Sequence, residues 1–338
     1  MRRATCLAFA LILGAVPAAA NGADLVVGSC AVDDQVPAEE RASYQRAAIA
    51  FVDALARGDA ADLRAAAFPE MWQGMSDAEI RASAGTTAET YGNFAAPHVV
   101  HSYRVVIRRF GEGETGFYPC AASARSGLKS EKDRVIVAVR NVPVQAHVVI
   151  EASANDVVWT FTLWLMPGEE RWQVSHMHVS AGGMGGMRPD RILSLARRER
   201  DAGRGLNARL LYSAAAGSSY RGPYLIPSDY RIAVAEMQAI PMAAPFDAPP
   251  PWRIETAASS AAILAMKPVL FPAVRKIYLE ITLDAQGLDD EAAEHANRAL
   301  ISAFKTAHPE YAAAFDGIVA SARIDDRKHW RTVDPAAP

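Results

Sequence analysis

Two histidines separated by one residue, His176 and His178, are the sharpest local candidates for chemistry in this sequence. The residues around them favour a β-strand, and side chains two positions apart on a strand point to the same side. We therefore expect both imidazoles to share a face with Trp172 and Val174. There they would serve as an acid–base pair or as polar contacts to a ligand, or they would be ordinary structural histidines at a strand end.

Methionines close to this pair raise the possibility of a metal site. Two histidines at this spacing can chelate one ion, and Met184 and Met187 follow shortly after them. Thioether and imidazole ligands together suit copper better than zinc. A complete site needs further ligands, for which the neighbouring predicted strands offer His98, His101 and His147. The competing interpretation is that the methionines only fill gaps in a core and that no cofactor is bound.

Other motifs associated with catalysis are incomplete. Ser126–Lys129 and Ser302–Lys305 match S-x-x-K, but the S-D-N and K-T-G partners of that chemistry do not occur. There is no G-x-S-x-G. Acidic pairs lack the spacing of a calcium loop and are interpreted as solvated ends of elements: Asp33-Asp34, Glu39-Glu40, Asp289-Asp290 and Asp325-Asp326. The absence of a complete catalytic set favours a non-catalytic protein.

The first twenty residues have the layout of a secretory signal. Arg2 and Arg3 precede an apolar run, and small residues lead up to Ala20. The run is too short to serve as a membrane anchor, which needs about 20 apolar residues. We expect cleavage near Ala20 and a periplasmic or secreted mature chain without a membrane span.

Removal of that segment leaves two cysteines, Cys30 and Cys120. A secreted chain with two thiols most simply forms one disulfide. Their spacing matches no redox or metal motif, so the sequence predicts a structural Cys30–Cys120 bridge.

The composition is that of an ordinary globular protein. The chain has 338 residues, of which 51% are hydrophobic and 22% are charged, and this length predicts two domains at about 150 residues each. These proportions exclude a disordered, coiled-coil or polytopic membrane protein. The net charge of −3 provides no basic field for nucleic acid, so no nucleic-acid partner is expected.

Hydrophobic periodicity predicts helices followed by strands in the first half of the chain. Helices are expected at 37–57, at 60–67 and at 76–91, where Ser76 and Glu79 form a capping box. Strands are expected at 98–110, 135–142, 145–151, 157–166 and 172–179, with a long loop over 111–133. This order is an α+β layout.

Glycine and methionine interrupt the pattern at 182–188, where we place a hinge between a domain over 21–181 and a second α+β domain over 189–338. The second domain is expected to contain helices at 189–202, 206–216 and 228–240, and a proline-rich connection over 241–251. A strand at 276–283 and helices at 289–307 and 309–323 complete it.

Two segments of the first domain resemble the NTF2-like (SnoaL-like) superfamily. Ala48–Asp59, with the sequence AIAFVDALARGD, resembles its opening helix, and Trp159–Met166 with Arg171–Val174 resembles its closing hairpin. The resemblance covers about residues 40–181. It implies a helix-backed, curved antiparallel sheet around a pocket, for which the candidate lining residues are Trp159, Phe161, Trp164, Trp172, His176 and His178. A filled sheet core would need the same apolar residues, so both interpretations stay open.

The resulting expectation is a non-catalytic binding or accessory protein of the cell envelope. Its pocket would hold a small apolar ligand or a protein partner. One alternative is an isomerase-like enzyme that uses His176 and His178 as an acid–base pair. The other is an extracytoplasmic copper-binding protein.

Overall fold

The computed structural model describes residues 26–111, 114–125, 133–155, 157–184, 186–256, 260–271, 276–326 and 328–335. The expected signal segment, 1–20, lies outside these residues. The chain divides into two compact units between Gly182 and Gly183, and Tyr220–Ser228 returns to the first unit. The two units are therefore not divided by a single boundary along the sequence. We call the two parts unit 1 and unit 2.

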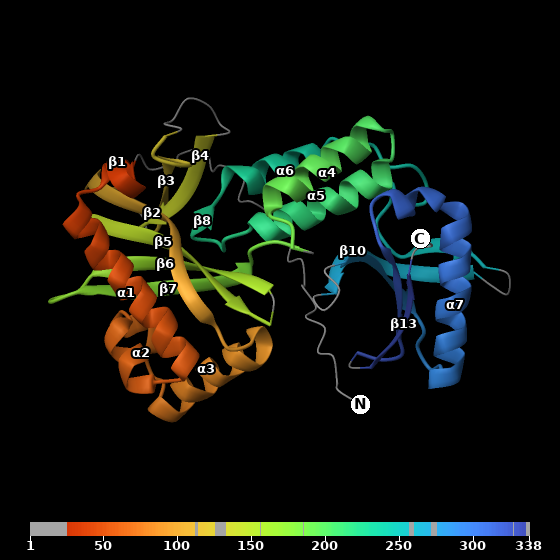
Figure 1. Ribbon diagram of the computed structural model, residues 1–338, viewed down its shortest axis with the longest axis horizontal. Coiled ribbons are helices and arrows are strands. Elements are labelled where there is room, and N and C mark those ends of the chain that lie inside the picture. The colour runs from red at the N-terminus through yellow and green to blue at the C-terminus, as the bar shows by residue number, and fades with distance from the viewer. Residues whose placement is uncertain are drawn as a thin grey trace. The chain divides into compact units, whose positions relative to one another are not determined.

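Three helices cover one face of the main sheet in unit 1 (Figure 1). They are α1 (Ala38–Arg57), α2 (Ala60–Ala66) and α3 (Asp77–Tyr91). Gly58 ends α1 with a left-handed φ of 64°, a conformation that glycine adopts without a steric penalty. The predicted capping box is confirmed, because Ser76 Oγ accepts from the Glu79 amide and the Glu79 carboxylate accepts from the Ser76 amide.

The main sheet of unit 1 is antiparallel throughout, in the order β1-β2-β5-β6-β7. Its strands are β1 (Val27–Val32), β2 (Ala95–Arg109), β5 (Val144–Ala154), β6 (Val157–Pro167) and β7 (Trp172–Ala181). On the helix-covered face, β6 contributes Trp159, Phe161, Leu163 and Leu165, all buried. They pack with Tyr44 and Phe51 of α1 in one core. Side chains therefore occupy the interior that the NTF2-like resemblance predicts to be a pocket.

A smaller sheet, β3-β4-β8, packs on the opposite face. It consists of β3 (Gly116–Ala121), β4 (Arg134–Val139) and β8 (Leu225–Ile226). The prediction of a loop over 111–133 is wrong for β3, which pairs with β4. Because a glycine opens β3 and Pro119 lies inside it, its composition gives little strand signal. The predicted disulfide is confirmed: Cys30 in β1 is bonded to Cys120 in β3.

Unit 2 packs helices against one face of a five-stranded sheet in the order β13-β12-β11-β10-β9. The strands are β9 (Trp252–Glu255), β10 (Ser260–Phe271), β11 (Lys276–Asp284), β12 (Gly317–Arg323) and β13 (His329–Pro335). The helices are α4 (Pro189–Asp201), α5 (Gly205–Ser219), α6 (Ser228–Gln238) and α7 (Asp290–Ala307). The β11–β12 pair is parallel, and α7 lies in the connection between them (Figure 1). Both units are therefore α+β.

One expected helix of unit 2, 309–323, is wrong. A short 3-10 helix over Pro309–Ala313 is followed by β12. The apolar stripe that includes Ile318 and Val319 belongs to a central strand, buried on both sides between β11 and β13. Pairing with β11 and β13 on its two sides overrides the local helical spacing. None of the helices in the described part of the chain has the length and hydropathy needed to cross a bilayer.

Candidate ligand-binding cleft

A β-bulge determines which way the two candidate histidines point. Trp164 pairs with His176, whereas its neighbour Leu165 pairs with Val174, so Ser175 is the extra residue. A bulge shifts the alternation of side chains by one position. Trp172 and Val174 therefore pack with the helix-covered core, and His176 stacks on Trp164 on the opposite face. The prediction that these histidines share a face with Trp172 and Val174 is wrong.

On that face His176 is part of an aromatic stack. The ring of Trp164, 1% exposed, lies between His147 and His176, with centroid distances of 5.3 and 5.1 Å. Tyr224 closes the stack at 4.3 Å from His176, and the Arg140 guanidinium lies 5.5 Å from the Trp164 ring. These contacts give the ring of His176 a packing role.

Burial lowers the pKa of His178 to about 4 and that of His147 to about 3. Burial also lowers the pKa of His176, with a further contribution from Arg140. These imidazoles are consequently neutral at neutral pH. General acid–base catalysis works best with a pKa near the operating pH, so the geometry favours a structural role for this pair.

The copper hypothesis depends on donors in two separate cores. Met184 and Met187 exchange two backbone hydrogen bonds of 2.9 Å with each other, and their side chains pack against the core of unit 2. His176 and His178 belong to unit 1. Among the residues that the structure describes, no three or more His, Cys, Asp or Glu side chains are grouped to hold a metal.

The predicted pocket residues separate into three environments. Trp159 and Phe161 lie in the helix-covered core, and Trp164 lies in the aromatic stack. Trp172 is half-buried, packs edge-on against Tyr44, and borders a groove of about 610 Å³ between α1 and the β6–β7 turn. Of the six candidates, Trp172 alone lines this groove, and none of them lines the cleft described next.

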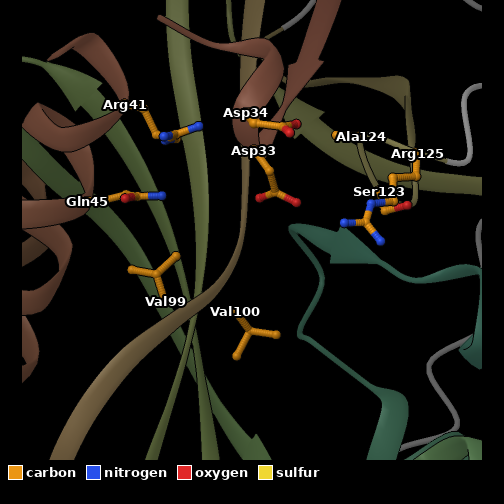
Figure 2. Close-up of a pocket in the computed structure, with 9 residues that line it drawn as sticks. All are labelled: Asp33, Asp34, Arg41, Gln45, Val99, Val100, Ser123, Ala124 and Arg125. Carbon is orange, nitrogen blue, oxygen red and sulfur yellow. The ribbon is translucent and has the colours of Figure 1, made fainter. Parts of the chain in front are cut away.

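The other hollow, which we call the cleft, was not expected from the sequence (Figure 2). It has a volume of about 420 Å³. Four segments of unit 1 form it: the 3-10 turn after β1, the first turns of α1, the middle of β2 and the residues after β3. The lining residues are Asp33, Asp34, Arg41, Gln45, Val99, Val100, Ser123, Ala124 and Arg125. Figure 2 shows Arg41 and Arg125 on opposite sides, with the two aspartates between them.

Asp33 is held in place by hydrogen bonds to β2. Its Oδ1 accepts from the Ser102 amide at 2.8 Å, and its Oδ2 lies 3.1 Å from His101 Nδ1. Burial by itself raises the pKa of Asp33, but the hydrogen bonds to His101 and to the Ser102 amide outweigh it and lower that pKa. The residue adopts a φ of 49°, which aspartate tolerates better than most side chains.

The remaining charges of the cleft have no partners. Within the described part of the chain, the side chains of Asp34, Arg41 and Arg125 form no hydrogen bond or ion pair. Arg41 is half-buried, whereas Asp34 and Arg125 are exposed. The cleft therefore presents two guanidinium groups and one carboxylate over a half-buried apolar floor of Val99 and Val100.

The walls of the cleft are tied together covalently and by a hydrogen bond. Cys30 precedes Asp33 by three residues, and its partner Cys120 precedes Ser123 by three. Gln35 Nε2 also donates to the Ala124 carbonyl at 3.2 Å. The disulfide was the one sequence feature that could have located this site, because it places the segment after β1 beside the segment after β3.

Comparisons with family models, with curated proteins and with solved structures find no match to the chain. The geometry of the cleft is therefore the basis for inferring a function.

Proposed function

We propose that the protein is a non-catalytic binding protein that acts outside the cytoplasm and holds a small amphipathic ligand in the cleft. The observation that carries the proposal is the set of unpartnered charges around an apolar floor in a cleft of about 420 Å³. Ligand sites are typically concave, largely apolar and supplied with a few convergent polar groups.

The extracytoplasmic location is supported by the secretory layout of residues 1–20 and by the Cys30–Cys120 disulfide. Disulfides persist mainly in oxidising compartments. A periplasmic or secreted protein accounts for both features.

An NTF2-like origin of unit 1 is part of the proposal. Three helices followed by an antiparallel sheet support it. The additional β3-β4-β8 sheet and the filled interior distinguish unit 1 from the pocket-forming arrangement that the resemblance implies. The ligand is accordingly assigned to the rim of the main sheet, at the cleft, instead of to its interior.

Native mass spectrometry of the mature protein, purified from its own envelope, tests the proposal. We expect a small molecule to be retained by the wild type and by Ala47→Trp, which fills the groove beside Trp172. Ala124→Trp fills the cleft and should lose the molecule. Equal retention by both variants would contradict the cleft as the site. Co-purification of a protein in place of a small molecule would contradict the small-ligand assignment.

A further inference from the structure

The charges of the cleft indicate the chemical class of its ligand, an inference that rests on the proposed function. Two guanidinium groups and one carboxylate surround the cleft without partners among the described residues. With Asp33 and Asp34 the cleft holds as many carboxylates as guanidinium groups, so a ligand that carries charges of both signs keeps the cleft balanced.

The guanidinium groups of Arg41 and Arg125 are suited to an anionic oxygen group. Guanidinium presents several donors in a rigid plane that matches a carboxylate, and such charge-assisted hydrogen bonds are among the strongest in proteins. Figure 2 shows the two arginines approaching the cleft from opposite walls.

The aspartates have different roles. The oxygens of Asp33 are already engaged by Ser102 and His101, whereas the Asp34 carboxylate is unpartnered and exposed. Asp34 is therefore the group available to a ligand cation. A purely anionic ligand would leave Asp34 uncompensated and would be repelled by it.

We propose that the cleft binds a small zwitterion. Its carboxylate lies between Arg41 and Arg125, its ammonium group lies at Asp34, and its apolar part rests on Val99 and Val100. A volume of about 420 Å³ lies within the range of about 300–1,000 Å³ typical of small-molecule sites. An amino acid derivative or a short peptide with free termini and apolar side chains has this chemistry.

Isothermal titration calorimetry with four matched probes tests the inference. Leucyl-leucine carries both end charges, its N-acetyl form only the anion, its amide only the cation, and N-acetyl-leucyl-leucinamide neither. We expect leucyl-leucine to bind, and each single cap to weaken binding at least tenfold.

Charge variants assign each end of the ligand. In the double variant Arg41→Gln with Arg125→Gln the free dipeptide and its amide should bind with similar affinity, because the carboxylate has lost both of its partners. In Asp34→Asn the free dipeptide and its N-acetyl form should become similar. Arg81→Gln and Glu169→Gln remove exposed charges outside the cleft and should behave as the wild type does.

Two results would overturn the zwitterion. One is equally tight binding of the doubly capped probe, and the other is no binding of any of the four. If Ala124→Trp nevertheless loses a retained molecule in native mass spectrometry, only the ligand class is wrong. If that variant keeps the molecule, the proposed function fails with it.

Discussion

Arginine and acidic side chains are hydrogen-bonded to one another in unit 2 but lie apart in the cleft of unit 1. In unit 2, Glu236 of α6 accepts two hydrogen bonds from Arg197 of α4, at 2.9 and 2.6 Å, and one from the Tyr212 hydroxyl of α5 at 2.7 Å. Arg200 adds a further contact at 3.3 Å. In the cleft of unit 1, two arginines and an aspartate have no such partners within the described residues.

A second cluster in unit 2 also has a glutamate whose carboxylate is fully hydrogen-bonded. The Glu199 side chain, 1% exposed, accepts from Arg204 at 2.6 and 2.8 Å and from Asn207 at 3.0 Å. Buried charges are tolerated when hydrogen bonds complete them. In unit 2, fully partnered Arg–Glu clusters join helices, whereas in the cleft of unit 1 the charges without partners among the described residues are those that the proposed ligand would use. Mutations can test that distinction.

The largest expected effect comes from the covalent brace of the cleft. The bridge in unit 1 spans 90 residues, and the chain-entropy treatment assigns such a loop about 4 kcal/mol of stabilisation. Cys30→Ala with Cys120→Ala should lower the free energy of unfolding by that order, measured by urea titration. The affinity of the cleft for its ligand should also fall, because the disulfide no longer links its two walls. An unchanged midpoint would contradict a stabilising role for the bridge.

Glu236→Gln should have the next largest effect. It leaves Arg197 in a partly buried cluster without its carboxylate, which costs about 2–3 kcal/mol. We expect a lower midpoint of thermal unfolding. Glu169→Gln removes an exposed carboxylate and should leave the midpoint unchanged. Equal midpoints for the two variants would show that the helix cluster does not differ energetically from a surface charge.

The two units should also respond differently to acid. The pKa of His178 is about 4 in the folded state, below its ordinary value of 6.5, so unfolding takes up a proton as the pH falls below 6.5. Through His178 alone, unit 1 should lose on the order of 2 kcal/mol by pH 4.5, and His147, with a pKa of about 3, adds to that loss. The pKa of Glu236 is held at about 2, chiefly by the hydrogen bond from Arg197, so its contribution is lost only below about pH 4.5.

Hydrogen exchange at pH 7.5, 5.5 and 4.5, corrected for intrinsic rates, measures this difference. Protection of β6 and β7 should fall over that range, while that of α4 to α6 persists. His178→Gln should reduce the loss in unit 1. Parallel loss of protection in both units would contradict the assignment of the acid sensitivity to the buried histidines of unit 1.

The smallest effects should separate two adjacent aspartates in the cleft. Asp33→Asn alters the hydrogen bond to His101 and weakens the hydrogen bond to the Ser102 amide, at a cost of about 1 kcal/mol. Asp34→Asn removes a charge without partners and should change stability by less than about 0.5 kcal/mol. Chemical denaturation of both variants measures the change in the free energy of unfolding. Equal changes for the two variants would contradict the prediction.

Local sequence patterns predicted α1 to α7 and the strands β2, β4, β5, β6, β7 and β11, but not β1, β3, β8, β9, β10, β12 or β13. The apolar spacing of α1 and the capping box of α3 specify those helices within their own residues, and alternation specifies β5, β6 and β11. Cys30 and Cys120, left as a pair in a chain with a secretory start, predicted their bridge. Each of these signals depends on neighbouring residues along the chain or, for the disulfide, on the number of cysteines.

Only the tertiary structure determined the remaining features, because each depends on contacts between separate segments. Pairing with β4 makes β3 a strand, and pairing with β11 and β13 makes β12 a strand, against their local composition. The bulge at Ser175 turns His176 away from Val174, and Tyr220–Ser228 returns to unit 1 after two helices of unit 2. The cleft assembles Asp34, Arg41 and Arg125 from three separate elements, and nothing in the spacing of these residues along the chain indicates that they line one hollow.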